Sequence, residues 1–346
     1  MNGFSEIQNR KDGHLRLALE ADSQSVTPTG LDRVRLIHNA LPEQALAQVS
    51  TKTVFMGRDI SLPLMIGAMT GGSEKGDAVN RLLAQLAAKH QIPLAVGSQR
   101  AALEKGAVSD LREHAGDALL ISNLGGLQLA DIDGIDLARR AVDSLQADAL
   151  AVHLNPLQEA VQPEGGSDWR GVLSAIAEAV EVLPCPVMVK EVGAGLSRRV
   201  IEQLHGVGVK YVDVAGHGGT NWTRIEQKRL PGDMAGTYDP FLEWGIPTLE
   251  AIQQAHASRG RLKGMTLIAS GGIRHGLDIV RALWLGADMT AAASPFLHAV
   301  MDKSENDAVT GFDALIEQWR TQMRLAMFLT GVSGVQAIPQ IDGSVV

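Results

Sequence analysis

The stretch Leu267-Ile268-Ala269-Ser270-Gly271-Gly272-Ile273-Arg274 decides the fold. A short apolar run ends in a serine, a glycine pair and an arginine. The next apolar run, Met289–Ala292, ends at Ala293-Ser294. Glycines let backbone N–H groups approach an anion, and the ends of the seventh and eighth strands of α/β barrels commonly bind phosphate. The two runs therefore predict a phosphate site at one rim of a parallel barrel.

Further apolar runs of the same kind precede these two along the chain. Each is continuously apolar, which is typical of parallel strands that are covered on both faces. Helical patterns separate them; in residues 77–90, for example, Val79, Leu82, Leu83 and Leu86 recur at helical spacing. The predicted strands are residues 64–67, 94–96, 118–121, 149–152, 187–189, 211–214, 267–269 and 289–292.

Eight strand–helix units of about 30 residues each predict an α/β fold of the (β/α)8 TIM barrel class. A doubly wound sheet is the alternative, but the even count and the absence of GxGxxG after the first strand weigh against it. Residues 1–60 form an N-terminal extension, and residues 221–247 form a long loop after the sixth strand. No linker divides the chain, so we expect residues 1–346 to be a single domain. Helix N-caps are expected at Asp136, Ser167 and Ser197.

Composition narrows the class of protein. The net charge of −8 is spread without acidic blocks, which argues against a nucleic-acid partner. Cys185 is the only cysteine, so no disulfide framework can form within one chain. Residues 1–14 lack the apolar core of a signal peptide, and no apolar run approaches the roughly 20 residues that span a bilayer. We therefore expect a cytoplasmic protein with no membrane partner.

Polar residues follow the predicted strands, at the rim where barrel enzymes carry their chemistry. Lys190 ends the fifth strand, where its charge is suited to a reduced flavin ring; a surface lysine and a Schiff-base nucleophile are the alternatives. His153 and Asn155 are two residues apart on a strand and therefore face the same side. His153 is also open to interpretation as a core histidine.

Together these strand ends resemble those of the type 2 isopentenyl-diphosphate isomerases, which are FMN-dependent barrels. The resemblance runs from Arg10 to Phe296. It implies interconversion of isopentenyl and dimethylallyl diphosphate with reduced FMN, with Mg²⁺ on the diphosphate and NADPH as the reductant. It also implies a homo-oligomer, a tetramer or octamer. The most specific motifs are Arg10-Lys11 with His14, residues 67–72, residues 97–100, residues 153–159, residues 218–222 and residues 244–248.

The resemblance implies a set of binding residues. The FMN contacts would be Ala68, Met69, Thr70, Ser98, Asn123, Lys190, Thr220, Gly272, Ile273, Arg274, Ala293 and Ser294. The substrate contacts would be Arg10, Lys11, Ser98, Gln99, Arg100, His153, Asn155 and Gln158. Glu159 would bind Mg²⁺, since this ion prefers one or two carboxylates plus substrate phosphate oxygens. The alternative interpretation of Arg10 and Lys11 is a solvated tail. The alternative for Glu159 is a carboxylate that stabilises the start of a helix.

The isomerisation requires a proton to be added at one carbon and removed from another. We hypothesise that the reduced flavin is the acid–base group and that Gln158 and Glu226 assist it. Gln158 does not change protonation state near neutral pH, so it should orient or polarise the substrate. Glu226 is equally able to pair with Arg224 or Arg229 on the surface. His14 is expected to cap the substrate or relay protons, with a surface histidine as the alternative.

Other barrel enzymes remain as rivals. FMN-dependent 2-hydroxy acid oxidoreductases resemble this chain at residues 216–219, where a histidine base is closely followed by an arginine that binds carboxylate. Thr220 occupies that arginine position here, which weakens this alternative. Barrels of the inosine-monophosphate dehydrogenase type need a loop cysteine, and Cys185 precedes the fifth strand, at the wrong end. A flavin-binding regulatory protein without catalysis is the third alternative.

Overall fold

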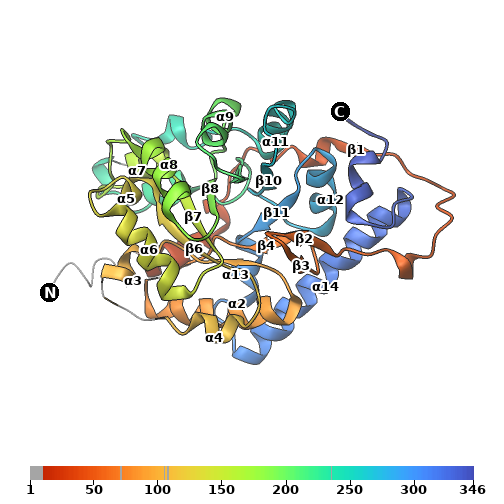
Figure 1. Ribbon diagram of the computed structural model, residues 1–346, viewed down its shortest axis with the longest axis horizontal. Coiled ribbons are helices and arrows are strands. Elements are labelled where there is room, and N and C mark those ends of the chain that lie inside the picture. The colour runs from red at the N-terminus through yellow and green to blue at the C-terminus, as the bar shows by residue number, and fades with distance from the viewer. Residues whose placement is uncertain (1–10, 71, 105, 107–108, 235) are drawn as a thin grey trace.

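Eight parallel strands form a closed barrel in the computed structural model, which describes residues 11–346 except 71, 105, 107–108 and 235 (Figure 1). Each strand pairs with the next in chain order, and β11 closes the ring against β4. All eight overlap the predicted runs, which confirms the (β/α)8 prediction. They are β4 Leu64–Ile66, β5 Leu94–Ala95, β6 Leu120–Gly125, β7 Ala149–Leu154, β8 Val187–Glu191, β9 Tyr211–Asp213, β10 Thr266–Ala269 and β11 Met289–Ala292.

Helices connect successive strands and surround the barrel (Figure 1). They are α2 Glu74–His90, α3 Arg100–Glu104, α4 Leu111–Ala115, α5 Gly126–Leu129, α6 Gly134–Leu145, α7 Pro156–Val161, α8 Val172–Val182, α9 Arg198–Gly206, α10 Trp222–Gln227, α11 Thr248–Ala257, α12 Gly276–Trp284, α13 Ser294–Val300 and α14 Glu305–Leu329. None of the helices in the described ranges is both long and apolar enough to cross a membrane.

The expected helix starts are only partly right. Ser197 caps α9 by accepting a hydrogen bond from the N–H of Val200, as predicted. Asp136 was wrongly expected to be a cap: α6 already begins at Gly134, and Asp136 lies in its first turn. Ser167 was also wrongly expected, because α8 starts after Gly171, which adopts a left-handed conformation.

The core has two layers because the strands are buried on both faces. Inside the barrel, side chains such as Met65, Ile121, Met188 and Ile268 pack against one another. The larger outer layer lies between the strands and the surrounding helices. This double burial explains why the strands are continuously apolar in sequence.

The N-terminal extension closes the end of the barrel opposite the rim that carries the polar residues. The hairpin of β2 (Thr53–Phe55) and β3 (Arg58–Ile60) turns at Met56-Gly57, both with positive φ, as two-residue hairpin turns require. Phe55 packs into the inner core, with its ring 5.8 Å from that of Tyr211 at the start of β9. Before this hairpin in the chain, β1 (Val34–Leu36) pairs antiparallel with β12 (Gly343–Val345), so the extension is tied to the C-terminal segment.

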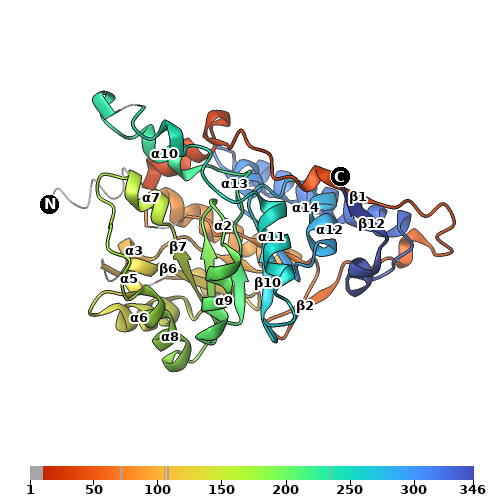
Figure 2. The same cartoon turned by 90° about the horizontal axis from the view of Figure 1, so that it is seen from above.

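The first part of the extension lies at the opposite end of the barrel. Residues 11–18 are helical and lie beside α10, which also contacts α7 (Figure 2). Lys228 Nζ donates to Glu20 (2.9 Å) and to Ser23 Oγ (3.0 Å), which ties the insertion after β9 to the extension. The two segments outside the repeat therefore meet above the strand ends.

Helix α14 holds α13 in place from outside. Trp319 of α14 is fully buried and its ring lies 5.6 Å from that of Phe296 in α13, which also packs on Phe312. Since α13 starts directly after β11, this aromatic cluster supports the last strand end of the rim.

We expect Trp319→Ala to lower the free energy of unfolding by about 3–5 kcal/mol, because it removes a large side chain from a packed core. Trp244→Ala is the control: Trp244 is 63% exposed and its loss should cost less than about 1 kcal/mol. Urea unfolding followed by circular dichroism measures both. Equal losses for the two variants would contradict the assignment of Trp319 to the core.

Candidate functional site

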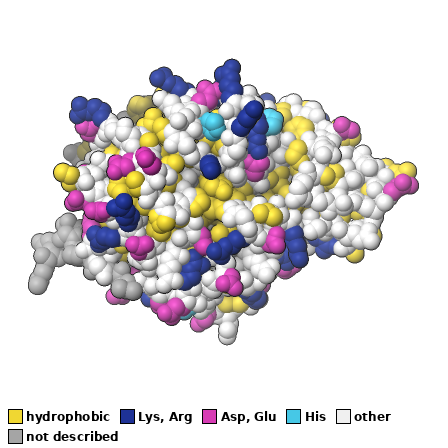
Figure 3. Space-filling model, in the orientation of Figure 1, with side chains coloured by type: hydrophobic (Ala, Val, Ile, Leu, Met, Phe, Trp, Pro, Cys, Tyr) yellow, Lys and Arg dark blue, Asp and Glu magenta, His cyan; other side chains and the backbone are white. Residues whose placement is uncertain are grey.

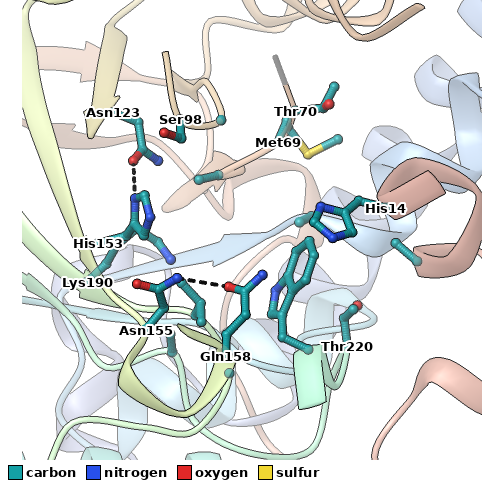
Figure 4. A pocket seen from close by; sticks show the side chains of 18 of the residues that line it. His14, Met69, Thr70, Ser98, Asn123, His153, Asn155, Gln158, Lys190 and Thr220 are labelled. Carbon is teal, nitrogen blue, oxygen red and sulfur yellow. Dashed lines mark hydrogen bonds between the residues drawn. The ribbon is translucent and has the colours of Figure 1, made fainter. Parts of the chain in front are cut away.

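A cavity of about 1200 Å³ opens at the carboxyl ends of the strands (Figure 4). Residues that follow every one of the eight barrel strands line it, as do Lys11, His14 and Trp222 from the two segments outside the repeat. This is the end where α/β barrels place their chemistry. The cavity therefore gathers most of the residues that the sequence singled out.

One wall of the cavity is an anion-binding cradle, formed by the backbone at residues 271–273 and 293–294. The N–H groups of Gly272, Ile273 and Ser294 donate no hydrogen bond to any part of the chain that the structure describes. Gly271 has a φ of 96°, and a Cβ there would lie 1.9 Å from the carbonyl oxygen of Gly216. Clustered free N–H groups on glycine-rich backbone suit a phosphate, so the cradle fits the phosphate of FMN.

The middle of the barrel mouth suits a flavin ring. Lys190, at the end of β8, is buried and lines the cavity together with Met69, Thr70 and Ser98 (Figure 4). Its ammonium group donates to the backbone oxygen of Glu191, which leaves two N–H donors for other partners. Thr220 lies across the cavity and is bridged to Gln24 of the extension. The donor set thus fits a planar, hydrogen-bonding ring whose reduced form is negatively charged.

Asn123 and His153 form a rigid pair at the ends of β6 and β7 (Figure 4). Asn123 Nδ2 donates to Val96 O (3.0 Å), so Asn123 Oδ1 is left to accept from His153 Nδ1 at 2.7 Å. Burial, and then the positive charges of Lys190 and Lys11, lowers the pKa of His153 to about 3. The imidazole is therefore neutral, and its Nε2 is an acceptor.

His14, Gln158 and Glu226 come together from three distant parts of the chain. Gln158 Nε2 donates to Glu226 Oε1 at 2.7 Å, and His14 Nε2 lies 3.1 Å from the same oxygen. The carboxylate is fully buried and its other oxygen is bound by Arg229. Glu226 therefore pairs with Arg229 inside the protein; the alternatives of a surface pairing and of Arg224 as its partner were wrong.

The charges of this cluster follow from its burial. Burial alone would raise the pKa of Glu226, but the contacts with His14, Gln158 and Arg229 outweigh it and lower the pKa below its usual value. Burial lowers the pKa of His14, although the carboxylate opposes this shift. Near neutral pH the cluster thus holds an ionised Glu226 beside a neutral His14. The ring of Trp222 stands edge-on to His14 at 5.3 Å.

Glu159 lies at the rim, in the first turn of α7. Its Oε2 accepts from the N–H of Gly166 (2.8 Å) and its Oε1 from Asn155 Nδ2 (3.2 Å). No group of three or more metal-ligating side chains occurs in the described residues. A lone oriented carboxylate fits an Mg²⁺ ion that takes its other ligands from water and substrate phosphate oxygens, and does not fit an all-protein cage.

Some predicted substrate contacts lie elsewhere. Gln99 does not line the cavity; its side chain accepts from the N–H of Asn123 and donates to Ala141 O. Arg10 lies outside the described residues. Arg100 reaches the rim, where its Nε donates to Glu104 (2.8 Å). Glu226 does not line the cavity itself, but it contacts Gln158 and His14, which do. The remaining residues of the predicted set line the cavity: Ala68, Met69, Thr70, Ser98, Asn123, Lys190, Thr220, Gly272, Ile273, Arg274, Ala293, Ser294, Lys11, His153, Asn155, Gln158, Glu159 and His14.

Among the cavity residues to which the sequence analysis gave no role there, Trp222 and Arg229 lie next to the cluster of His14, Gln158 and Glu226. Trp222 and Arg229 both belong to the insertion and line the cavity. The position of Arg229, three residues after Glu226, was the available signal, because residues at this spacing lie on the same face of a helix. Trp222 belongs to the motif at residues 218–222, in which it had no assigned role.

His217 is not in the cavity. Its Nε2 lies 3.0 Å from Glu243 Oε2, and the other oxygen of Glu243 accepts from Arg224 at 2.7 Å. The buried histidine therefore ties the loop after β9 to the end of the insertion. Acting as a base on a ligand of the cavity would require it to leave this partner.

Comparisons with known proteins identify the family of this chain. The family of FMN-dependent dehydrogenases matches residues 146–342. The isopentenyl-diphosphate delta-isomerase of Cronobacter sakazakii is 43% identical over 339 residues, which are 96% of this chain and 95% of that protein. The protein of the same name from Stutzerimonas stutzeri is 44% identical over 340 residues, 96% of each chain.

Solved structures share the fold at lower identity. A mandelate oxidase mutant with a monooxide FMN adduct has a TM-score of 0.64 at 19% identity, over 92% of this chain and 90% of that one. A lactate oxidase from Pediococcus acidilactici has a TM-score of 0.68 at 13% identity, over 91% and 84%. These likenesses concern the barrel alone, whereas the full-length sequence matches are specific. The chain therefore belongs to the isopentenyl-diphosphate delta-isomerase family, built on the barrel of the FMN-dependent dehydrogenases.

Proposed function

We propose that this protein interconverts isopentenyl and dimethylallyl diphosphate, with reduced FMN and Mg²⁺ bound in the cavity. The observation that carries the proposal is the cluster of His14, Gln158 and Glu226, a proton-handling group beside a cavity that also has an anion cradle and a buried lysine. NADPH as the reductant of FMN and assembly as a homo-oligomer belong to the same proposal and rest on the family resemblance.

The diphosphate would bind between the extension and the rim. Lys11 and Arg100 line the cavity and carry the positive charge that a diphosphate needs. Glu159 would hold Mg²⁺ against the phosphate oxygens, with Asn155 and the N–H of Gly166 fixing the carboxylate. Asn155 also donates to Gln158 Oε1 at 3.1 Å, so the diphosphate site and the proton-handling cluster share a residue.

When bound, the reduced FMN supplies an electron-rich ring that can exchange a proton with the alkene and stabilise nearby positive charge. Lys190 would lie against the negative part of the ring. The cradle at residues 271–273 and 293–294 would hold the phosphate with backbone N–H groups. Lys190 and the cradle would thus hold the two ends of the cofactor at the barrel mouth.

The chain's own groups would handle the second proton. Glu226 is ionised and buried, so it can accept a proton from the substrate, either through His14 or directly from a substrate carbon that lies near Gln158. Gln158 donates one amide N–H to Glu226 and has a second for the substrate. The negative charge of Glu226 and the face of Trp222 would both favour a cation-like species in the cavity.

Oxidation of a 2-hydroxy acid is the less favoured function. That chemistry needs a histidine base at the flavin and an arginine for the substrate carboxylate. His217 is engaged with Glu243 outside the cavity, and Thr220 stands where the arginine would follow.

The direct test is to load the protein with FMN, reduce it without oxygen and add labelled isopentenyl diphosphate with Mg²⁺. Dimethylallyl diphosphate formed without stoichiometric reductant supports the isomerase, and oxidation of a 2-hydroxy acid instead contradicts it.

We expect Glu226→Gln to lower kcat by at least about 100-fold with little change in FMN affinity, because the buried proton acceptor is removed. Glu243→Gln is a matched control: Glu243 also belongs to the insertion and contacts one histidine and one arginine. Its partners His217 and Arg224 do not line the cavity, whereas the partners of Glu226 do. The kcat of Glu243→Gln should stay within about threefold of the parent, although the protein should unfold more easily. A Glu226→Gln variant with parental kcat would remove this residue from the mechanism.

The cradle predicts a crowding effect on FMN binding. In Gly272→Ala the new Cβ would meet Thr29 Cγ2 at 2.4 Å and Gly218 O at 2.5 Å, so the backbone must move and FMN affinity should fall at least about tenfold. Gly264→Ala is the control, since Gly264 has nearly the same φ (76° against 73°) but nothing within 4 Å of its Cβ. Fluorescence titration with FMN compares them. Equal effects would mean that backbone strain, and not the cradle, determines affinity.

The neutral His153 predicts a pH dependence of stability. Its pKa is about 3 when folded and about 6.5 when unfolded, so the unfolded chain binds the extra proton between these values. This contribution to stability is complete above about pH 6.5 and is lost as the pH falls towards 3. We expect His153→Gln to flatten the fall in unfolding free energy of the FMN-free protein over that window. His298→Gln, which changes an exposed histidine, should leave the slope unchanged.

A further inference from the structure

Asp213 is a buried carboxylate that the proposed mechanism does not use. It ends β9, is completely buried and lies directly beside Lys190 in the register of β8 and β9. Paired residues on neighbouring parallel strands point to the same face of the sheet. Lys190 lines the cavity, so Asp213 lies at the barrel mouth next to the lysine.

The hydrogen bonds of Asp213 satisfy only one of its oxygens. Oδ1 accepts from Ser270 Oγ at 2.7 Å and from the N–H of Ala215 at 3.1 Å. The buried Oδ2 has no hydrogen-bond partner in the described part of the chain. A buried carboxylate with an unsatisfied oxygen is costly unless an opposite charge compensates it.

Lys190 is the nearby charge that acts on this carboxylate. Burial raises the pKa of Asp213 above its usual value; Lys190 is the largest influence that opposes this rise, ahead of the hydrogen bonds from Ser270 and Ala215, and reduces it without cancelling it. The lysine ammonium has spare N–H donors, since its one hydrogen bond goes to the backbone of Glu191. The lysine thus has capacity for both Asp213 and a ligand in the cavity.

Two other ionisable groups lie close to this pair, and neither replaces Asp213. Glu191 Oε2 is engaged by the N–H groups of Val192 and Gly193, both at 2.6 Å, and of the two residues that follow. His153, opposite Lys190 on β7, is neutral. Asp213 is therefore the acidic group beside Lys190 that keeps a buried oxygen without a hydrogen-bond partner in the described part of the chain.

We propose that Asp213 is the counter-charge of Lys190, a positioning residue that limits how strongly the lysine favours reduced over oxidised FMN. In its ionised form the aspartate offsets the charge of the neighbouring lysine, so the site then stabilises the anionic reduced ring less strongly than the lysine alone would. Ser270 connects this pair to the first residue of the cradle, so the carboxylate also links the ring end of the site to the phosphate end. This inference rests on the proposed binding of FMN across the barrel mouth.

The cofactor test compares Asp213→Asn with Asp288→Asn. Asp288 is an aspartate at the opposite end of the barrel, where it accepts from the N–H of Leu267. Titrations with oxidised and reduced FMN give two Kd values for each protein. In Asp213→Asn the uncompensated lysine should raise the ratio of oxidised to reduced Kd at least about tenfold, which is about 30 mV in reduction potential for a two-electron couple. Asp288→Asn should leave the ratio within twofold. An unchanged or lower ratio in Asp213→Asn overturns the proposal.

A second test needs no cofactor and no activity. Lys190→Met, Asp213→Asn and the double variant are unfolded in urea as FMN-free proteins. If the two charges compensate each other, the double variant should have an unfolding equilibrium constant at least about tenfold lower than the product of the two single effects requires. The same holds if Asp213→Asn alone fails to fold and Lys190→Met rescues it. Additive effects, or failure without rescue, overturn the proposal. A chain that binds no FMN would contradict the proposed function and leave this second test intact.

Discussion

The direct contact between the backbone of residues 216–219 and that of residues 271–272 is the constraint on which the site depends. A Cβ on Gly219 would lie 2.6 Å from the nitrogen of Gly272, and one on Gly218 would lie 2.6 Å from the nitrogen of Thr29. Three segments of backbone therefore stack with no room for side chains. This packing places the cradle at the end of β10 and at the same time holds the extension against the loop after β9.

The extension and the insertion form the polar cluster, while the barrel forms the cradle. Figure 3 shows acidic and basic side chains interspersed on one face of the molecule, which is consistent with a net charge of −8 without acidic blocks. Around the cavity, by contrast, charges are paired: the buried Glu226 with Arg229, and the half-buried Glu243 with Arg224. A buried pair of this kind contributes more to a unique arrangement than to stability. The two pairs engage Arg224 and Glu226 of α10 and so help to hold the carboxylate of Glu226 against Gln158.

The sequence predicted the barrel well because burial on both faces imposes a continuous apolar run on each strand. It predicted most of the cavity residues because the carboxyl ends of parallel strands meet at one rim. Helix starts were less certain, since tertiary packing decides whether a helix begins at Asp136 or at Gly134. Gln99 and Glu226 show the main limit. Both contact partners from remote segments, Ala141 for Gln99 and His14 for Glu226, and no local pattern shows which way such a side chain turns.

The arrangement of charge across the cavity connects the fold to the proposed chemistry. Lys190 and the free N–H groups of the cradle make the flavin side positive, while the ionised Glu226 makes the opposite side negative. Under the proposed function, a reduced, electron-rich ring would be stabilised on the first side and a cation-like alkene on the second. Each charge has a neighbour of the opposite kind, Asp213 for the lysine and Arg229 for the glutamate. In the proposal these neighbours reduce the electrostatic effect of both groups on a ligand. An isomerase returns its cofactor unchanged. Partly compensated charges suit such a site, because it must stabilise opposite charges without binding either the substrate or the product too tightly.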